Sequence, residues 1–153
     1  FGRVRPVILP RIHENLIPLS FAQQRLWFID QLIDERHVYN VPVALSLQGP
    51  LDKEALQAAC VELIQRHESL RTQIHVQEGQ AYQRIVEHPQ FTIKETDLSA
   101  LSKAERSEQS RTYIQEEATK AFDLSNDLLI RAQLLRLEAE ENILMLSMPV
   151  IGM

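Results

Sequence analysis

The residues that most often carry out chemistry are scattered along this 153-residue chain. Its histidines are His13, His37, His67, His75 and His88. No two of them have the i, i+4 spacing that presents a pair of metal ligands from one face of a helix. A zinc or other metal site is therefore not expected.

Motifs for a nucleophile or for phosphate binding are also missing from the sequence. The single cysteine, Cys60, has no histidine close to it along the chain, and no serine stands in a Gly-x-Ser-x-Gly turn. None of the 4 glycines forms a glycine-rich loop before a helix, so a nucleotide site is not expected. Cys60 lies on the apolar side of an expected helix, which predicts a buried packing thiol in a reducing, cytoplasmic setting.

Composition predicts a single globular domain and excludes several partners. The chain is 44% hydrophobic and 24% charged, with a net charge of -5. This charge gives no basic surface for phosphates, so nucleic acid is not an expected partner. No apolar run approaches the roughly 20 residues that span a bilayer, and residues 1–10 do not resemble a signal peptide. The chain begins at Phe1, as expected of a piece of a longer polypeptide or of a processed one.

Helix signals and a linker organise the chain. Residues 1–18 are rich in proline and predict an extended linker, so the folded part is expected to cover residues 19–153. Ser20 and Gln23 form a capping box for a helix that ends near Ile33. Asp52 can cap a second helix, which ends near His67. A third helix, largely solvated, is expected across residues 99–117.

Apolar alternation predicts the strands. Val41, Val43, Leu45 and Leu47 have the period of a half-buried strand. Two hairpins are expected, and a short strand lies between them in sequence. The first hairpin joins residues 70–76 to 82–86 through a turn at 78–80, the short strand covers 91–94, and the second hairpin joins 128–137 to 143–148. Strands interrupted by helices predict an α/β (α+β) sandwich, in which a mixed β-sheet packs with helices.

Several ordered segments resemble the condensation domains of nonribosomal peptide synthetases. The first-helix signature of that family is similar to residues 20–29, where the matching positions are Ser20, Ala22, Gln23, Arg25, Leu26 and Trp27. The second signature resembles Arg66-His67-Glu68 followed by Leu70-Arg71-Thr72. Residues 39–42, 121–124 and 128–132 are also typical of the family. The wording of the first signature most resembles the subtype that joins an L-configured donor to an L-acceptor.

The resemblance implies a fold and a function. Such domains join two aminoacyl or peptidyl thioesters, each on the phosphopantetheine arm of a carrier protein, through an amide bond. Two lobes similar to chloramphenicol acetyltransferase surround a tunnel, and this chain would be the N-terminal one. The implied partners are carrier proteins and the missing C-terminal lobe, and no cofactor would bind this chain directly. Strand edges and apolar patches left open in a single lobe predict self-association.

The catalytic motif implied by the resemblance does not appear. Residues 143–148 are in register with the strand that leads to His-His-x-x-x-Asp-Gly, but Pro149 and Val150 occupy the two histidine positions. Val150 has no lone pair with which to accept a proton. We therefore expect no catalytic residue in this chain and no activity from it alone. The change after Met148, with the chain ending at Met153, predicts a truncated or frameshifted gene or a trimmed expression product.

The motif residues have structural interpretations as well as functional ones. Arg25 is expected to be a surface or ion-pair residue rather than a tunnel residue, and Trp27 a core residue rather than a docking residue. Arg66 and Arg71 resemble arginines that brace the active site, and each either lacks a partner or pairs with Glu68. His67 is expected to cap or pack rather than to act as an acid or base.

Two other functions remain open from the sequence. One is a binding module that keeps a surface for carrier proteins or another partner without chemistry. The more distant one is a coenzyme A dependent acyltransferase of the same superfamily, which should lack the first-helix wording seen here.

Overall fold

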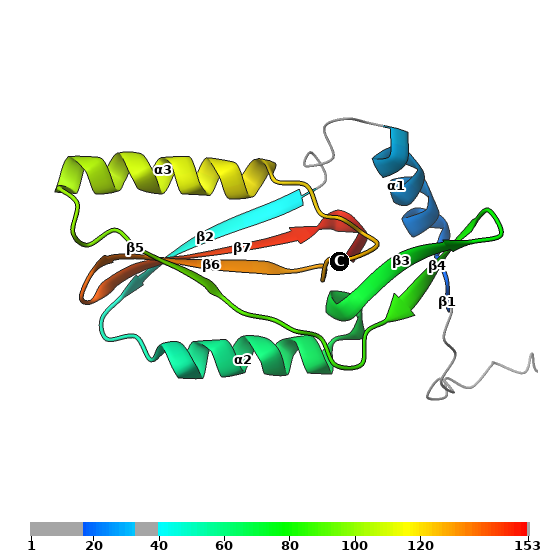
Figure 1. Cartoon of the computed structure of the whole chain (residues 1–153), viewed down its shortest axis with the longest axis horizontal. Coiled ribbons are helices and arrows are strands. Elements are labelled where there is room, and N and C mark those ends of the chain that lie inside the picture. Colours follow the sequence, from blue (N-terminus) through cyan, green and yellow to red (C-terminus); the bar gives the residue numbers. More distant parts are fainter. Residues whose placement is uncertain (1–16, 33–39, 153) are drawn as a thin grey trace, which may run out of the picture.

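A computed structural model of the chain describes residues 17–32 and 40–152. Within these residues the strands form a three-stranded sheet with the order β1-β4-β3 and a four-stranded sheet with the order β2-β7-β6-β5. Figure 1 shows the smaller sheet and helix α1 at one end of the long axis and the larger sheet along the rest. This arrangement of sheets and packed helices confirms the predicted α+β class.

The four-stranded sheet has β7 (Glu141–Pro149) next to its edge strand β2 (Asn40–Gln48). On its other side β7 pairs with β6 (Arg131–Glu138), and both pairings are antiparallel. The last strand, β5 (Lys94–Asp97), runs parallel to β6. A parallel pair needs a long crossover connection, and α3 (Lys103–Thr119) supplies it here.

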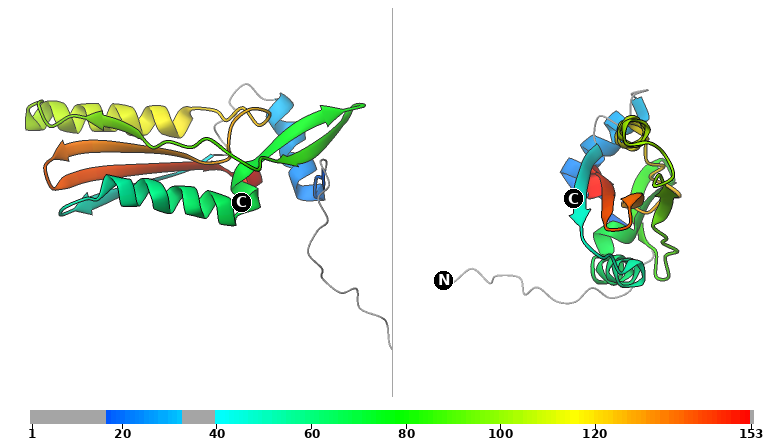
Figure 2. Two further views of the ribbon diagram at one scale, coloured as in Figure 1. Left: turned by 60° about the horizontal axis from the view of Figure 1, so that its bottom comes forward. Right: turned by 90° about the vertical axis from the view of Figure 1, so that its left-hand side faces the viewer.

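Two helices cover opposite faces of this sheet. Successive strand residues point to opposite faces, so Leu134 and Leu135 of β6 enter different cores. Leu134 packs in a cluster with Cys60 of α2 (Lys53–Arg66), whereas Leu135 packs with Met145, against which α3 places Tyr113. Figures 1 and 2 both show the sheet between α2 and α3. Cys60 is 8% exposed, which confirms the predicted packing thiol.

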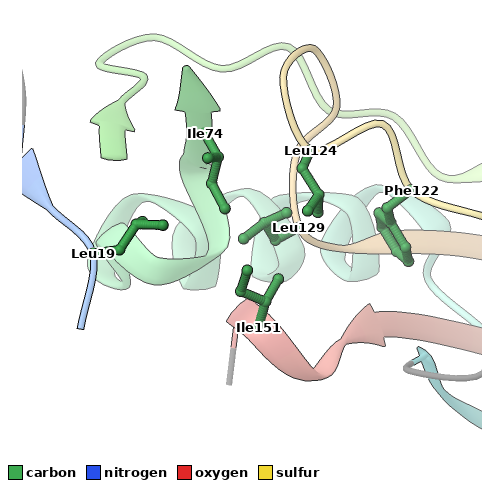
Figure 3. Close-up of a cluster of buried hydrophobic side chains, with 6 residues drawn as sticks. All are labelled: Leu19, Ile74, Phe122, Leu124, Leu129 and Ile151. Atoms are coloured by element: carbon green, nitrogen blue, oxygen red, sulfur yellow. The ribbon is translucent and has the colours of Figure 1, made fainter. Parts of the chain in front are cut away.

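The smaller sheet joins α1 (Phe21–Leu32) to the rest of the domain. Its strands are β1 (Ile17–Pro18), β3 (Thr72–Gln77) and β4 (Gln80–Ile85). Glu78 and Gly79 join β3 to β4 with φ values of 53° and 76°, the positive pair typical of a tight hairpin turn, and this confirms the first hairpin. Against this sheet lies a cluster of buried residues, shown in Figure 3: Leu19, Ile74, Phe122, Leu124, Leu129 and Ile151.

Capping interactions explain where the helices begin. The Ser20 capping box is confirmed, because the Gln23 amide donates to Ser20 Oγ at 3.1 Å and the Ser20 amide to Gln23 Oε1 at 2.9 Å. Asp52 accepts from the Ala55 amide at 3.0 Å, as expected. The third helix starts at Lys103 rather than at residue 99, because Ser102 and Glu105 form its capping box. Most of its residues are solvated, as predicted.

Two strand boundaries differ from the prediction. The short strand expected at 91–94 is β5 at Lys94–Asp97, because Gln57 of α2 satisfies the backbone before it. Gln57 donates to the Phe91 carbonyl at 2.7 Å and accepts from the Ile93 amide at 2.9 Å. β6 begins at Arg131 rather than at residue 128, since the Leu129 amide instead donates to the carbonyl of Leu70 at 3.0 Å.

The strand predicted at 41–47 forms, but the predicted burial of its apolar side chains was wrong. Val43 and Leu45 are 40% and 44% exposed, although their alternation indicated a half-buried face. The reason is that β2 is an edge strand, so no further strand shields it.

Some of the predicted boundaries lie outside the described residues. These are residues 1–16 of the predicted linker, Ile33 at the predicted helix end, and Tyr39. Ile17 and Pro18, at the end of that linker, pair with β4. Across 17–32 and 40–152, no helix combines the length and apolarity that a membrane crossing requires. The same residues contain no group of side chains suited to a metal ion.

The buried thiol predicts a dependence of stability on pH. Burial raises the pKa of Cys60 above its ordinary value of 9.0, so the folded chain favours the protonated thiol. The buried, protonated thiol therefore contributes to the free energy of unfolding. This stabilisation is fully present below pH 9.0 and is lost as the pH rises through the folded-state pKa. We expect the difference in unfolding free energy between the wild type and Cys60→Ala to shrink above pH 9.0. Urea denaturation of both proteins from pH 8 upward measures this difference, and a difference that stays constant with pH would contradict the prediction.

Candidate active-site region at the end of β7

The end of β7 is where the resemblance places a catalytic motif. Pro149 is buried and pairs with Asn40 of β2, and the chain then turns into the short 3-10 helix η3 (Val150–Gly152). Val150 is 37% exposed, and Ile151 is buried at 6%. Neither Pro149 nor Val150 carries a side-chain group that can accept or donate a proton. The two positions that would hold histidines therefore offer no acid–base chemistry.

Ile151 lies between two small cavities. Figure 3 shows it reaching from η3 toward Leu129. The first cavity, of about 20 Å³, is lined by Leu26, Asp30, Asn40, Phe122, Leu124, Pro149 and Ile151. The second, of about 50 Å³, is lined by Gln23, Ser69, Thr72, Ile74, Gln83, Leu129 and Ile151. Both are far below the roughly 300 Å³ at which ligand pockets begin, so neither of these two cavities holds a thioester substrate by itself.

Gln23 connects α1 to the smaller sheet. Its Oε1 accepts from the Ser20 amide and also from Gln83 Nε2 of β4, at 3.1 Å. Gln83 Nε2 lies 3.1 Å from the Pro18 carbonyl as well, so β1, α1 and β4 meet at one hydrogen-bonded point. Trp27 packs against the buried cluster next to η3, while Arg25 is exposed. Within residues 20–29, the contacts of Ser20, Gln23 and Trp27 therefore hold the fold together.

The comparisons with known proteins bear on these segments. The profile of the family described as "Condensation domain" matches residues 13–148. This chain belongs to that family. It is 40% identical over 146 residues to one of the linear gramicidin synthase proteins of Brevibacillus parabrevis, and the match covers 95% of this chain and 2% of the synthase. The family match ends at Met148, directly before Pro149.

Solved structures give the same result for the fold. The starter condensation domain of rhizomide synthetase superposes with a TM-score of 0.82 at 21% identity, covering 92% of this chain and 34% of that one. The X-domain in a complex with OxyB from teicoplanin biosynthesis gives 0.78 at 27% identity, covering 96% and 31%. The chain thus spans about a third of these structures. The resemblance to condensation domains is confirmed, whereas the donor and acceptor subtype stays a prediction.

The second condensation signature lies where α2 meets the smaller sheet. Arg66 pairs with Glu62 at 2.8 Å, and both side chains are exposed. His67 is also exposed, and its backbone N–H bonds to the Leu63 carbonyl at the end of α2. Arg66, His67 and Glu68 thus lie on the surface of the condensation lobe, outside both cavities beside η3.

Arg71 differs from the other signature residues because it is partly buried. It ends the 3-10 helix η2 (Glu68–Arg71). Its guanidinium donates to the Val86 carbonyl at 3.0 Å and to the Gln65 carbonyl at 3.4 Å. Its Nε is buried without a hydrogen-bond partner among the described residues. The contacts with Val86 and Gln65 join the end of α2 to the segment after β4, so Arg71 braces this part of the condensation lobe through backbone carbonyls.

Sequence reasoning missed the arginine that organises the loop beside Pro149. Arg131 Nε contacts Glu117 Oε1 at 2.8 Å, and its other nitrogens donate to the carbonyls of Ala121 at 2.9 Å and Lys120 at 2.6 Å. Its guanidinium carbon lies 3.9 Å from the centre of the Phe122 ring. Asn40 Nδ2 also donates to the Lys120 carbonyl, at 2.8 Å. An arginine at the start of an apolar strand was the available signal, but its partners depend on the fold.

Proposed function

We propose that residues 19–153 are the N-terminal lobe of a condensation domain and that this chain alone does not form amide bonds. The intact domain would act on aminoacyl or peptidyl thioesters carried on phosphopantetheine arms, which this chain does not bind by itself. Family membership and the span of about a third of the solved domains support this assignment. The observation that carries the inactivity is that Pro149 and Val150, which we place at the motif positions, have no side-chain group that can exchange a proton.

The chemistry explains why these two positions matter. In amide formation the acceptor nitrogen attacks the thioester carbonyl carbon, the C–N bond forms and the C–S bond breaks. The nitrogen must lose a proton, which leaves with the thiolate as a thiol. A base or a charge-stabilising group beside the nitrogen lowers the barrier to this transfer. Pro149 and Val150 supply neither.

An exposed stripe on α1 supports a partner surface in the intact domain. Phe21, Phe28 and Leu32 are 84%, 58% and 68% exposed, and with Arg25 they follow the spacing of one helix face. An apolar face of this kind marks a contact with another protein or lobe. Carrier proteins and the C-terminal lobe are the partners that we propose, in a cytoplasmic setting in which Cys60 stays reduced. In the absence of carrier proteins and of the C-terminal lobe, we propose that this chain self-associates.

A condensation assay tests the proposal. The 153-residue chain is mixed with a donor and an acceptor carrier protein, each loaded with L-alanine, and dipeptidyl carrier is measured by intact-protein mass spectrometry. We expect no product above the uncatalysed background, with an intact condensation domain as the positive control. Adding a C-terminal lobe together with a version of this chain that carries the histidine motif should produce product. Product from the chain alone would overturn the proposal.

A second candidate function is a binding module without condensation chemistry. It is supported by the absence of acid–base groups at 149 and 150 and by the likeness to an X-domain that was solved in a complex with OxyB. Pull-down of this chain with loaded carrier proteins, without any lobe added, tests it. Carrier binding that is lost in Phe28→Gln, with no product formed, would favour this module. The first-helix segment at residues 20–29 argues against a coenzyme A dependent acyltransferase, which should lack it.

A further inference from the structure

Strand β2 leaves one side of the larger sheet open. It is the edge strand in the order β2-β7-β6-β5, and Figures 1 and 2 show it outermost. Five consecutive residues, 42–46, are exposed. Natural edge strands are usually protected by charged side chains, prolines, bulges or covering loops; Asn40–Gln48 contains Pro42 but carries no charged residue. In the described part of the chain, no strand pairs with its outer side.

The register with β7 shows which backbone groups face outward. The Gly49 amide donates to the Glu140 carbonyl at 2.7 Å, continuing the ladder at an odd-numbered residue of this segment. Pro42 pairs with Ser147, and Pro149 pairs with Asn40, so the two prolines, which have no N–H, both stand at pairs whose β2 residue has an even number. Antiparallel ladders alternate bonded and non-bonded pairs, so the odd residues of β2 bond to β7. The N–H and C=O groups of residues 40, 44, 46 and 48, and the C=O of 42, therefore point away from the sheet.

We propose that β2 pairs with β2 of a second copy of this chain, antiparallel and centred on Ala44, so that the two sheets become one. Ala44 then lies opposite the partner's Ala44, and each donates its outward N–H to the other's carbonyl. This proposal deepens the self-association proposed above and is independent of carrier binding.

The sequence of the strand favours this register over its neighbours. Ala44 is the midpoint of the nine-residue strand, so only this centre pairs every residue from 40 to 48. Val43 then lies opposite the partner's Leu45, and Val41 opposite the partner's Leu47, which covers the two exposed apolar side chains. Pro42 lies opposite the partner's Ser46 and accepts its N–H, although it cannot donate in return. No like charges meet anywhere along the pair.

Charge variants at the two-fold axis test the pairing. Ala44→Lys and Ala44→Glu each place two like charges directly opposite each other, and Ala44 is exposed, so the fold should be kept. By sedimentation velocity we expect a concentration-dependent dimer for the wild type and a dimer affinity lowered about tenfold or more for each variant. An equal mixture of the two variants should dimerise again. Ala58→Lys and Ala58→Glu, on an exposed α2 position, are the matched controls and should behave as wild type.

A cross-link gives a second, independent readout. In a hydrogen-bonded antiparallel pair the Cα atoms lie about 5.5 Å apart, within the range of roughly 4.4–6.8 Å that a disulfide spans. Ala44→Cys should therefore give an oxidised dimer on a non-reducing gel, and Ala58→Cys should not. A wild-type monomer at every soluble concentration would overturn the proposal. So would Ala44 variants that associate as the wild type does, or a variant mixture that stays monomeric.

Discussion

Arg131→Ala is expected to lower the free energy of unfolding by about 3 kcal/mol, because it leaves a largely buried carboxylate without its partner. The Arg131 and Glu117 side chains are 17% and 13% exposed and approach to 2.8 Å. The same guanidinium satisfies the carbonyls of Lys120 and Ala121 after α3. Its contact with the Phe122 ring adds a further contribution of about 0.5–2 kcal/mol to the same site. Urea denaturation followed by Trp27 fluorescence and by far-UV circular dichroism measures the loss.

Two further variants distinguish the loss of the Arg131 network from the effect of removing any arginine charge. Arg131→Lys keeps the charge but loses the planar fork, so it should recover only part of the stability. Arg66→Ala removes a pair with Glu62 in which both partners are exposed, and its cost should stay below about 0.5 kcal/mol. A loss in Arg131→Ala no larger than that in Arg66→Ala would show that the buried network contributes nothing.

The Arg131 network also connects stability to the candidate site. The carbonyls to which Arg131 donates lie directly before Phe122, which lines the cavity beside Pro149. Asn40 reaches the same Lys120 carbonyl from β2 and pairs in register with Pro149. Three segments distant in sequence therefore meet at one carbonyl. The end of β7 is positioned by this junction, whose members Asn40 and Arg131 stand in family-like stretches outside the two signatures.

Features with local causes could be predicted from the sequence. The Ser20 capping box depends on residues three apart, and the turn at Glu78-Gly79 depends on Gly79, which accepts positive φ without steric cost. The start of β5 could not be predicted in this way, because Gln57 of α2 bonds to the backbone of residues 91 and 93 from another element. The exposure of Val43 depends on strand order, which alternation along one strand does not contain.

The site shows the same division. The placing of Pro149 and Val150 at the family's histidine positions follows from the register of side-chain types along β7, which is local information, and it stays a prediction. The pair of Arg66 with Glu62 was not among the alternatives, although Glu62 lies one helical turn before Arg66. The pairing of Glu117 with Arg131 needed the path of the chain from α3 into β6. Ion pairs that connect elements were therefore the least predictable part.

Leu135→Ala is the core substitution from which we expect a comparably large effect, about 3 kcal/mol in the free energy of unfolding. Leu135 is fully buried at 0% exposure and packs with Leu98 and Met145 under α3. Shortening its isobutyl side chain to a methyl group loses apolar burial and leaves a cavity that strand and helix backbones cannot close. Because domains of this kind have about 5–15 kcal/mol in total, the variant should unfold at clearly lower urea concentration.

The matched control is the same change at a half-exposed position. Leu63 on α2 is 50% exposed, so Leu63→Ala removes the same atoms while losing little buried area, and its cost should stay below about 1 kcal/mol. Equal losses at the two positions would mean that α3 does not cover this face of the sheet in solution. A large loss at Leu135 alone would show that the isolated lobe has a packed core on the α3 face, without the rest of a condensation domain.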